Sequence, residues 1–438
     1  MHTLKKSMPS ITALFPLVRD RGIRQLVVQY TDACNARCPQ CSMRVTEPFK
    51  RSKLDKATAT KIIDAAARKG VKALSFTGGE PLLYLDEITD LLKYARSAGI
   101  TYTRTGTNGY LFANPEKRGY LDGVKKLAGK LADAGLYTFW ISIDSVDPAV
   151  HESMRGLPRV IAGIEKALPL FHAHGIYPSA NLGINRNMGG FVQQPFSGPA
   201  QFYAYYRQSF QKFYQRIIDM GFTIVNACYP MSIDNGDASG LSAVYGATNT
   251  TGITHYTAEE KSLLFKALFH TIPEFRRHIR IFSPRSSLYS LMRQQINPEY
   301  GFACRGGIDY LFVNARDGNT YPCGYRGGED LGKFWDLDLS ELNRLSSCRK
   351  CHWECFRDPS EMIGPLISLF TSPYLFYRRM MLDGPFRRIW ADDIKYFLAC
   401  DSFDCRLPPN FAKLALFGET RISDMKSIEQ EIAEVCLS

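Results

Sequence analysis

Long hydrophobic runs are missing from this 438-residue sequence. No segment reaches the roughly 18 consecutive apolar residues that a membrane-spanning helix needs, because the most apolar stretch, residues 363–377, is shorter and contains two prolines. The N-terminal segment carries basic residues, but Pro16 interrupts its short apolar part, so a secretory signal is not predicted. We therefore expect a cytoplasmic protein, with a peripheral contact at the membrane as the open alternative.

Long runs of lysine and arginine are also absent, although 54 Lys and Arg against 43 Asp and Glu give a net charge of +11. A basic surface aids solubility and does not by itself identify a partner, so no nucleic acid is expected. No short-period repeat is visible, and 45% hydrophobic with 22% charged residues is typical of a globular protein. At this length the chain has room for more than one domain.

Short strand-like segments alternate with amphipathic helical segments between residues 24 and 228. This alternation predicts a parallel sheet covered by helices, and six units fit a partial (β/α)6 barrel of the TIM type better than a complete eight-unit barrel. The expected strands are Gln25–Thr31, Lys72–Thr77, Tyr102–Thr107, Thr138–Asp144, Pro178–Ile184 and Thr223–Ala227. The expected helices are Lys56–Lys69, Asp86–Ala98, Glu116–Ala134, Pro158–His174 and Phe202–Met220.

Composition shifts divide the rest of the chain. Residues 235–254 are rich in Gly, Ser, Thr and Asn, which is typical of a loop or linker, and a helix is expected to begin after Thr257. The expected organisation is an N-terminal extension (1–23), the barrel (24–234), a linker and helical segment (235–300), a small Cys-rich auxiliary domain with a β-hairpin and helices (301–360), and a basic, aromatic, helical tail (361–438).

Three of the twelve cysteines, Cys34, Cys38 and Cys41, follow the first expected strand with the spacing C-x3-C-x2-C. A closed structural zinc site takes four protein ligands, so three thiolates leave one coordination position open. Active sites of α/β barrels form on the loops at the carboxyl ends of the strands, which favours a catalytic metal centre here. A zinc site completed by a distant His or Cys, including one in a nucleic-acid-binding protein, is the alternative.

This spacing resembles that of the radical SAM superfamily, and further family motifs follow in order. The motif Gly78-Gly79-Glu80 comes after the second expected strand. Glycines there let backbone approach a ligand, and a carboxylate can bind an ammonium group. The other positions that match the family are Asn108 in "TNG", Ser142 and Asp144 in "SIDS", Arg155, and Asn181 on the fifth strand.

The resemblance implies a [4Fe–4S] cluster on the three cysteines, with S-adenosylmethionine (SAM) on its fourth iron. Reductive cleavage of SAM would yield a 5′-deoxyadenosyl radical, in an oxidoreductase or transferase that a flavodoxin- or ferredoxin-type protein reduces. Glu80 is expected to bind the amino group of SAM, Arg155 its carboxylate, and Ser142 or Asp144 its ribose. The residue before the third cysteine is usually aromatic in the family, whereas here it is Gln40.

A second group of cysteines lies between residues 304 and 355. Cys304 and Cys323 flank an expected hairpin, with strands at Leu311–Asn314 and Thr320–Cys323 and Asp317-Gly318 as the turn signal. Four of five cysteines are expected to bind an auxiliary [4Fe–4S] cluster, with zinc as the alternative; these five are Cys304, Cys323, Cys348, Cys351 and Cys355. The remaining ones, Cys228, Cys400, Cys405 and Cys436, are expected to be structural thiols, with a second cluster on Cys400 and Cys405 as the alternative.

The hairpin resembles the SPASM or twitch auxiliary-cluster modules that follow many radical SAM barrels. Residues 348–362 also resemble the corresponding segment of the radical SAM family of hopanoid biosynthesis, the adenosylhopane synthases. That likeness implies a lipid or terpenoid substrate, while the SPASM likeness implies a peptide or another small molecule. An iron–sulfur electron-transfer protein without enzymatic activity is the remaining alternative, and it has no need of Glu80.

Aromatic residues and arginines are interleaved between Leu366 and Tyr396, where Arg378, Arg379, Arg387 and Arg388 occur in pairs. Such a segment can lie at a membrane interface. Nucleic-acid binding is a further reading, but such a segment more often forms a packed helix pair with one solvated face, which is the favoured interpretation.

Overall fold

The computed structural model describes residues 24–41, 50–192, 196–231, 240–244, 252–295, 297–340, 342 and 348–417. The predicted N-terminal extension (1–23), most of the predicted loop at 235–254, the end of the tail and Cys436 lie outside these residues.

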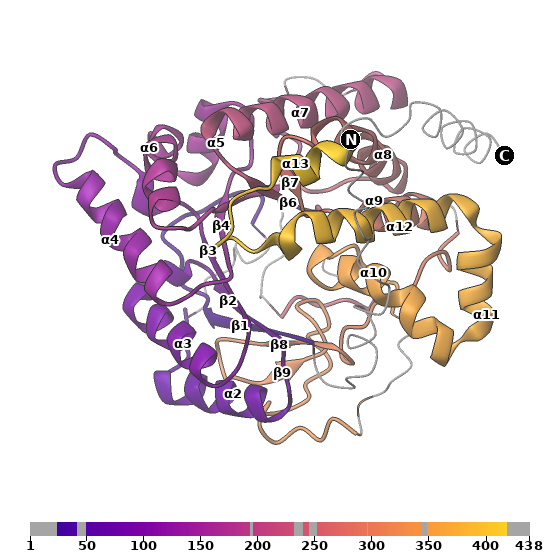
Figure 1. Cartoon of the computed structure of the whole chain (residues 1–438), viewed down its shortest axis with the longest axis horizontal. Helices are drawn as coiled ribbons and strands as arrows, with labels where there is room; N and C mark the ends of the chain where they lie inside the picture. Colours follow the sequence, from indigo (N-terminus) through magenta and orange to yellow (C-terminus); the bar gives the residue numbers. More distant parts are fainter. Residues whose placement is uncertain are drawn as a thin grey trace, which may run out of the picture.

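Six parallel strands form the centre of a single sheet and lie side by side in sequence order (Figure 1). They are β1 (Gln25–Thr31), β2 (Ala73–Gly78), β3 (Tyr102–Thr107), β4 (Thr138–Ser142), β5 (Ser179–Gly183) and β6 (Ile224–Cys228). The predicted α/β fold with a partial barrel is confirmed, since the sheet is parallel through these strands and does not close on itself.

Both edges of the barrel sheet are extended by strands from later in the chain. The short β7 (Arg280–Ile281) pairs with β6. At the other edge, β8 (Tyr310–Val313) runs parallel to β1, and β9 (Thr320–Tyr321) completes the predicted hairpin antiparallel to β8. The hairpin turns at Gly318, whose φ of 73° is left-handed. The hairpin of the Cys-rich segment is therefore a direct continuation of the barrel sheet.

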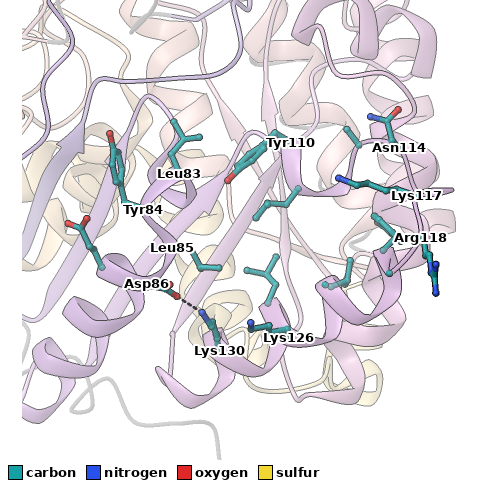
Figure 2. Close-up of a pocket in the computed structure, with 18 residues that line it drawn as sticks. Leu83, Tyr84, Leu85, Asp86, Tyr110, Asn114, Lys117, Arg118, Lys126 and Lys130 are labelled. Atoms are coloured by element: carbon teal, nitrogen blue, oxygen red, sulfur yellow. Dashed lines mark hydrogen bonds and ion pairs between the residues drawn. The ribbon is translucent and has the colours of Figure 1, made fainter.

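The predicted barrel helices pack around the outside of this sheet (Figure 1). They are α2 (Lys56–Arg68), α3 (Leu85–Ser97), α4 (Tyr120–Asp133), α6 (Val160–Ala173) and α7 (Pro199–Met220). Two short 3₁₀ turns, η2 (Pro81–Tyr84) and η3 (Tyr110–Phe112), follow β2 and β3 and border a surface pocket next to α4 (Figure 2). One helix was not predicted: α5 (Pro148–Arg155), which begins where the Asp147 side chain accepts hydrogen bonds from the backbone of Ala149 and Val150.

Strand residues alternate between the helix-covered face and the inner face of the sheet. Phe139, Ile141 and Leu182 are fully buried in the core that the helices cover. Their neighbours Asn181 and Cys228 point the other way and keep intermediate exposure. The inner face is consequently polar and accessible, which is where a ligand can bind without disturbing the core.

The C-terminal half is mainly helical. The predicted start of α8 (Ala258–Phe275) is confirmed, because the side chain of Thr257 accepts from the Glu260 backbone in a capping box. The helices that follow are α9 (Arg285–Gln294), α10 (Glu354–Thr371), α11 (Pro373–Phe376), a π-helical segment (Tyr377–Leu382), α12 (Gly384–Ala399) and α13 (Phe411–Leu414). Among the described helices, none has both the length and the hydrophobicity that a membrane span requires.

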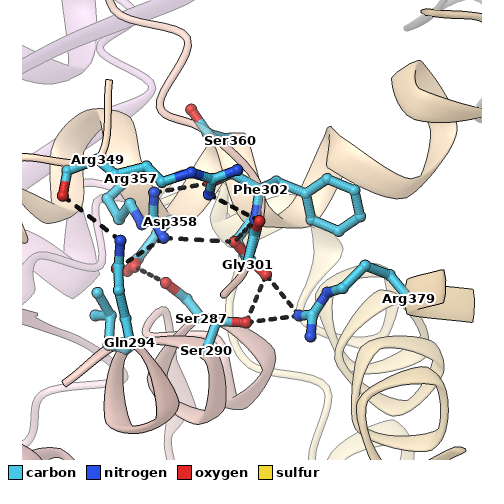
Figure 3. A network of polar contacts seen from close by, with 12 residues as sticks. Ser287, Ser290, Gln294, Gly301, Phe302, Arg349, Arg357, Asp358, Ser360 and Arg379 are labelled. Atoms are coloured by element: carbon cyan, nitrogen blue, oxygen red, sulfur yellow. Dashed lines mark hydrogen bonds and ion pairs between the residues drawn. The ribbon is translucent and has the colours of Figure 1, made fainter. Parts of the chain in front are cut away.

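A buried polar network holds α9, α10 and the π-helical segment together (Figure 3). The carboxylate of Glu361, which is fully buried, accepts from Ser290 Oγ at 2.5 Å, Phe302 N at 3.0 Å and Arg379 Nη2 at 3.1 Å. Arg357 donates to the Phe302 carbonyl at 2.7 Å. Because Phe302 precedes Cys304 by two residues, the network also fixes the segment that leads to that cysteine.

We expect Glu361→Ala to lower the free energy of unfolding by about 3–5 kcal/mol. The substitution removes the carboxylate that pairs with the buried guanidinium groups of Arg357 and Arg379. The control is Asp90→Ala, which removes an ion pair with Lys56 whose side chains are both 54% exposed and which is worth about 0–1 kcal/mol. The urea midpoint followed by circular dichroism measures both. Equal shifts for the two variants would contradict the importance of the network.

Candidate active site

The loop that follows β1 carries three cysteines and lies against the loop that follows β2. The backbone of Gly79 donates to Thr31 O and that of Glu80 to Ala33 O, both at 2.8 Å. A Cβ on Gly78 would lie 2.0 Å from Thr31 O, and one on Gly79 would lie 2.2 Å from Ala33 O. Gly78 and Gly79 are therefore required because a side chain at either position would keep the cysteine loop from packing against the loop after β2. The sequence pattern does not reveal this role.

The three thiols of this loop influence one another. Cys34 is exposed, Cys41 is half-buried and Cys38 is buried. Burial raises the pKa of Cys38 to about 12, with the nearby Arg155 acting in the opposite direction and Cys34 and Cys41 adding to the rise. Metal coordination supplies the positive charge that thiolates in such surroundings need, so this donor set fits an iron–sulfur cluster.

Glu80 connects the ends of β2 and β3. Its side chain is fully buried, and its two carboxylate oxygens accept from the backbone N–H groups of Leu82 at 3.0 Å and Asn108 at 2.6 Å. Burial raises its pKa to about 7, while these hydrogen bonds and Arg155 oppose the rise. The Thr107 side chain is a third donor to this carboxylate. A carboxylate has about four lone-pair sites, so one is left for a further donor such as an ammonium group.

Asn108 brings the β3 loop into contact with the cysteine loop. Its side-chain amide donates to Asn35 Oδ1 at 2.8 Å and points to Cys34 Sγ at 3.6 Å. Its carbonyl accepts a long hydrogen bond from Arg155 Nη1 at 3.4 Å. Asn108 thus lies between the first cysteine and the arginine.

Asp144 is the centre of a buried charge cluster. Its Oδ2 accepts from Arg155 Nε at 2.6 Å and from Gln40 Nε2 at 2.5 Å. Burial opposes the charge of Arg155, but Asp144 and Cys38 hold its pKa above the usual value. His151 accepts from the Asp144 backbone at 3.0 Å, and burial lowers its pKa to about 4, so it is neutral at pH 7.

Two features of this cluster are chemically available to a ligand. Arg155 has five N–H donors, of which the contacts above use two. The Oε1 atom of Gln40 is buried and has no hydrogen-bond partner among the described residues. A buried acceptor without a donor is costly, which indicates that a donor from a bound molecule completes it. Sequence analysis noted Gln40 only as a departure from the family and missed its contact with Asp144.

Ser142 and Asn181 lie beside each other on β4 and β5, but Asn181 belongs to a different cluster. Its Oδ1 accepts from Asn226 Nδ2 at 3.1 Å and Cys228 Sγ at 3.3 Å. The Asp144 cluster adjoins this one, since a Cβ on Gly183, the partner of Cys228 in the sheet, would lie 2.8 Å from Asp144 Oδ1.

The N-terminus of α10 completes this inner-face cluster. Glu354, which is 5% exposed, accepts from Tyr229 N at 3.2 Å and faces Cys355 Sγ at 3.6 Å, and burial raises its pKa. Burial lowers the pKa of Arg104 on β3, which lies near the Cys355 thiol; within the described ranges it has no carboxylate partner. The sequence pattern does not single out Arg104 or Glu354; for Arg104 the usable signal is a charged residue inside a strand.

Four cysteines of the second group line one small cavity together with Trp353 and Phe356; they are Cys304, Cys323, Cys348 and Cys351. Burial and then the other three thiols raise the pKa of Cys323, which indicates that the four lie close together. This donor set fits an auxiliary cluster. Cys355 instead lies with Glu354 and Cys228 on the inner face.

Cys400 and Cys405 are both fully buried in the hydrophobic core. Each interacts electrostatically with Arg280, away from the cysteine cavity. Among the residues that the structure describes, no three His, Cys, Asp or Glu side chains are placed to hold one metal ion. In a [4Fe–4S] cluster each thiolate binds its own iron, so the sulfurs need not converge on a single point.

Comparisons with known proteins bear on the barrel half of the chain. Residues 28–185 match the model of the radical SAM superfamily. The GTP 3′,8-cyclase of Alkaliphilus metalliredigens is 33% identical over 156 residues, which are 34% of this chain and 45% of that protein. The PqqA peptide cyclase of Gluconobacter oxydans is 29% identical over 172 residues, covering 39% of this chain and 44% of that protein.

A longer match extends past the barrel. The AdoMet-dependent heme synthase of Oleidesulfovibrio alaskensis is 23% identical over 364 residues, with 78% of each protein covered. The chain spans less than half of the length of the two cyclases. All of the barrel residues that carry the motifs, from Cys34 to Asn181, fall inside the matched segment. Residues 28–185 are therefore similar to the radical SAM superfamily.

Proposed function

We propose that the protein is a radical SAM enzyme that cleaves S-adenosylmethionine reductively and modifies an organic substrate with the resulting radical. The observation that carries this proposal is the contact chain from Cys34 through Asn108 and Arg155 to Asp144. This chain of contacts supports the proposal because it links the cysteine loop to the Arg155 guanidinium, while the Glu80 carboxylate accepts from the Asn108 backbone beside it.

Cys34, Cys38 and Cys41 would hold a [4Fe–4S] cluster, which would supply the electron for reductive cleavage of SAM to methionine and a 5′-deoxyadenosyl radical. Glu80 binds the ammonium group of SAM, and the positive charge of that group stabilises the ionised form of the Glu80 carboxyl. Arg155 binds its carboxylate with the donors that remain, and Asp144 positions the guanidinium.

The rest of the SAM site follows from the same contacts. Ser142 or Asp144 reaches the ribose hydroxyls, and Gln40 Oε1 accepts a hydrogen bond from the bound cofactor. Gly78, Gly79 and Asn108 hold the loops in place. Asn181 lines the boundary between cofactor and substrate. An electron-transfer protein without enzymatic activity would not need Glu80 or Arg155 in these positions.

Cys304, Cys323, Cys348 and Cys351 hold an auxiliary [4Fe–4S] cluster in a SPASM- or twitch-like arrangement. The substrate meets the inner-face cluster between the two cysteine sites. There Arg104 offers a cation, Glu354 a carboxyl group, and Asn226 a buried Oδ1 that has no partner among the described residues.

An exposed apolar and basic surface of the C-terminal helices supports a lipid or terpenoid as the substrate class. We define the α11 patch as the exposed apolar residues Leu369, Phe370, Tyr374, Tyr377, Met381 and Leu382 together with the exposed Arg378, Arg387 and Arg388. Exposed apolar patches mark interaction sites, and arginines among them favour an anionic membrane. The fourth arginine of the predicted pairs, Arg379, is buried in the polar network and does not contribute.

The likeness of residues 348–362 to the adenosylhopane synthase family supports the same substrate class. A peptide- or small-molecule-modifying enzyme is the second candidate, because one relative of the barrel is a peptide cyclase.

Reconstituted protein with dithionite and SAM should form 5′-deoxyadenosine, and Cys38→Ala should form none. We expect Arg155→Met to weaken SAM binding about 10- to 100-fold, because it removes charge-assisted hydrogen bonds to the carboxylate. Equilibrium dialysis measures binding and chromatography measures the nucleoside. Arg159→Met, which changes an arginine that is 59% exposed, is the control and should bind SAM normally. Fully loaded wild-type protein that forms no 5′-deoxyadenosine would overturn the proposed function.

Iron and sulfide analysis after anaerobic purification should give about eight irons per chain, counted as roughly four for each [4Fe–4S] cluster. Cys351→Ala should retain about four, because it removes a ligand of the auxiliary cluster. Cys355→Ala is the matched control on the same segment and should retain about eight. Loss of iron from Cys355→Ala, or zinc without sulfide in the wild type, would contradict this assignment.

Vesicle co-sedimentation tests the α11 patch. The protein should bind vesicles that contain phosphatidylglycerol more strongly than vesicles of phosphatidylcholine alone. The triple variant Phe370→Ser, Tyr374→Ser and Leu382→Ser should lose most of this binding. The control variant carries Leu121→Ser, Phe191→Ser and Leu407→Ser, which change exposed apolar residues elsewhere. Equal binding by both variants would remove the structural support for a lipid substrate.

A further inference from the structure

A surface pocket of about 830 Å³ lies between the start of α3, the 3₁₀ turns after β2 and β3, and α4 (Figure 2). Its walls come from the segments that directly follow the SAM-site motifs, η2 after Glu80 and η3 after Asn108, and from the first turns of α4. Leu83, which is 38% exposed, and the half-buried Tyr84 and Tyr110 supply its apolar part.

The pocket is positively charged. Lys117, Arg118 and Lys126 are exposed at its rim. Lys126 interacts electrostatically with Asp86, whereas Lys117 and Arg118 have no carboxylate partner among the described residues. The two carboxylates in the lining are already paired, Asp86 with Lys130 and Glu87 with Lys53 at 2.7 Å. The lining therefore holds more cations than carboxylates, and an approaching molecule meets Lys117 and Arg118 without a neutralising acid among the described residues.

The cations are spread around the pocket. Figure 2 shows Lys117 and Arg118 on one side and Lys126 and Lys130 on another. A phosphate or carboxylate ion is normally bound by donors that converge on it. Separated cations around an aromatic floor instead complement an extended acidic protein surface.

The pocket is also connected to Cys34. Tyr110, which lines it, donates its backbone N–H to Asn108 Oδ1 at 2.9 Å, and the Asn108 amide points to Cys34 Sγ at 3.6 Å. The Tyr110 hydroxyl donates to Leu82 O at 3.0 Å and so joins the two walls. Cys34 is exposed, so a protein seated on the pocket lies next to the cysteine loop.

We propose that this pocket, with Lys117, Arg118 and Lys126 at its rim, docks the acidic one-electron carrier protein of the flavodoxin or ferredoxin class that reduces this enzyme. The proposal rests on the proposed function, which requires one electron for each SAM cleaved. The carrier is oxidised by one electron, the sulfonium of SAM is reduced, and the C5′–S bond breaks to give methionine and the 5′-deoxyadenosyl radical.

The test compares two reductants in the reconstituted full-length protein. The triple variant Lys117→Glu, Arg118→Glu and Lys126→Glu should form 5′-deoxyadenosine at least tenfold more slowly with a subsaturating, enzymatically reduced flavodoxin of strongly negative charge, since electrostatic steering changes association rates by about 10- to 1,000-fold. With dithionite its rate should stay within about twofold of the wild type, because a small reductant needs no docking surface. Added salt should slow only the flavodoxin-driven reaction of the wild type.

The matched control reverses three exposed cations elsewhere, Lys212→Glu, Arg277→Glu and Lys395→Glu, and so reproduces the change in net charge. A flavodoxin-driven rate that falls equally in both triple variants would overturn the proposal, as would one that falls in neither. Equal losses with dithionite and flavodoxin would also overturn it, because the cations would then act on the SAM site or the fold.

Direct binding separates this proposal from the proposed function. Oxidised flavodoxin immobilised on a biosensor should bind the wild type in low salt and bind the pocket variant at least tenfold more weakly. If dithionite produces no 5′-deoxyadenosine, the proposed function fails, and the biosensor still decides whether the pocket docks the carrier. Inorganic phosphate or ATP that competes with flavodoxin at micromolar concentration would identify a small-anion site and overturn the proposal.

Discussion

The contact between the cysteine loop and the loop after β2 is the constraint on which the site depends. Two backbone hydrogen bonds of 2.8 Å hold it, and two glycines make it sterically possible. Glu80 leaves this contact and binds the backbone of Asn108. From Asn108 the contacts run through Arg155 and Asp144 to Gln40, which is back in the cysteine loop. The polar groups form a closed ring around the carboxyl ends of β1 to β4, so each member fixes its two neighbours.

The architecture of the barrel was predictable because it depends on patterns that the chain repeats. Strands and helices with one buried face each repeat their apolar residues at a characteristic spacing that the sequence shows. The predicted bounds of β1 and β3 agree with the observed ones. Motifs at the carboxyl ends of parallel strands meet at one edge, so sequence order alone brings Cys34, Glu80 and Arg155 to the same region. The unpredicted α5 is a short helix, and its capping Asp147 was the available signal.

Other features were not predictable because they depend on long-range packing. The spacing of Cys348, Cys351 and Cys355 leaves open which cysteine faces away. Because α10 begins at Glu354, Cys355 lies on the helix, whereas Cys348 and Cys351 lie before it. One hydrogen-bond partner of Asp144 is Gln40, which lies 104 residues earlier in the sequence. Arg379 belongs to a basic pair in the sequence, but in the structure it is buried and donates to Glu361 and Asp383. Local composition does not distinguish this buried arginine from its exposed neighbour.

The pairing of β8 with β1 has a consequence for the synthesis of the chain. The ribosome releases β1 long before β8, and during that interval one edge of the apolar first strand has no partner. Exposed strand edges pair with other chains, and non-local pairings form slowly. The nascent barrel therefore carries an aggregation-prone edge until the hairpin arrives.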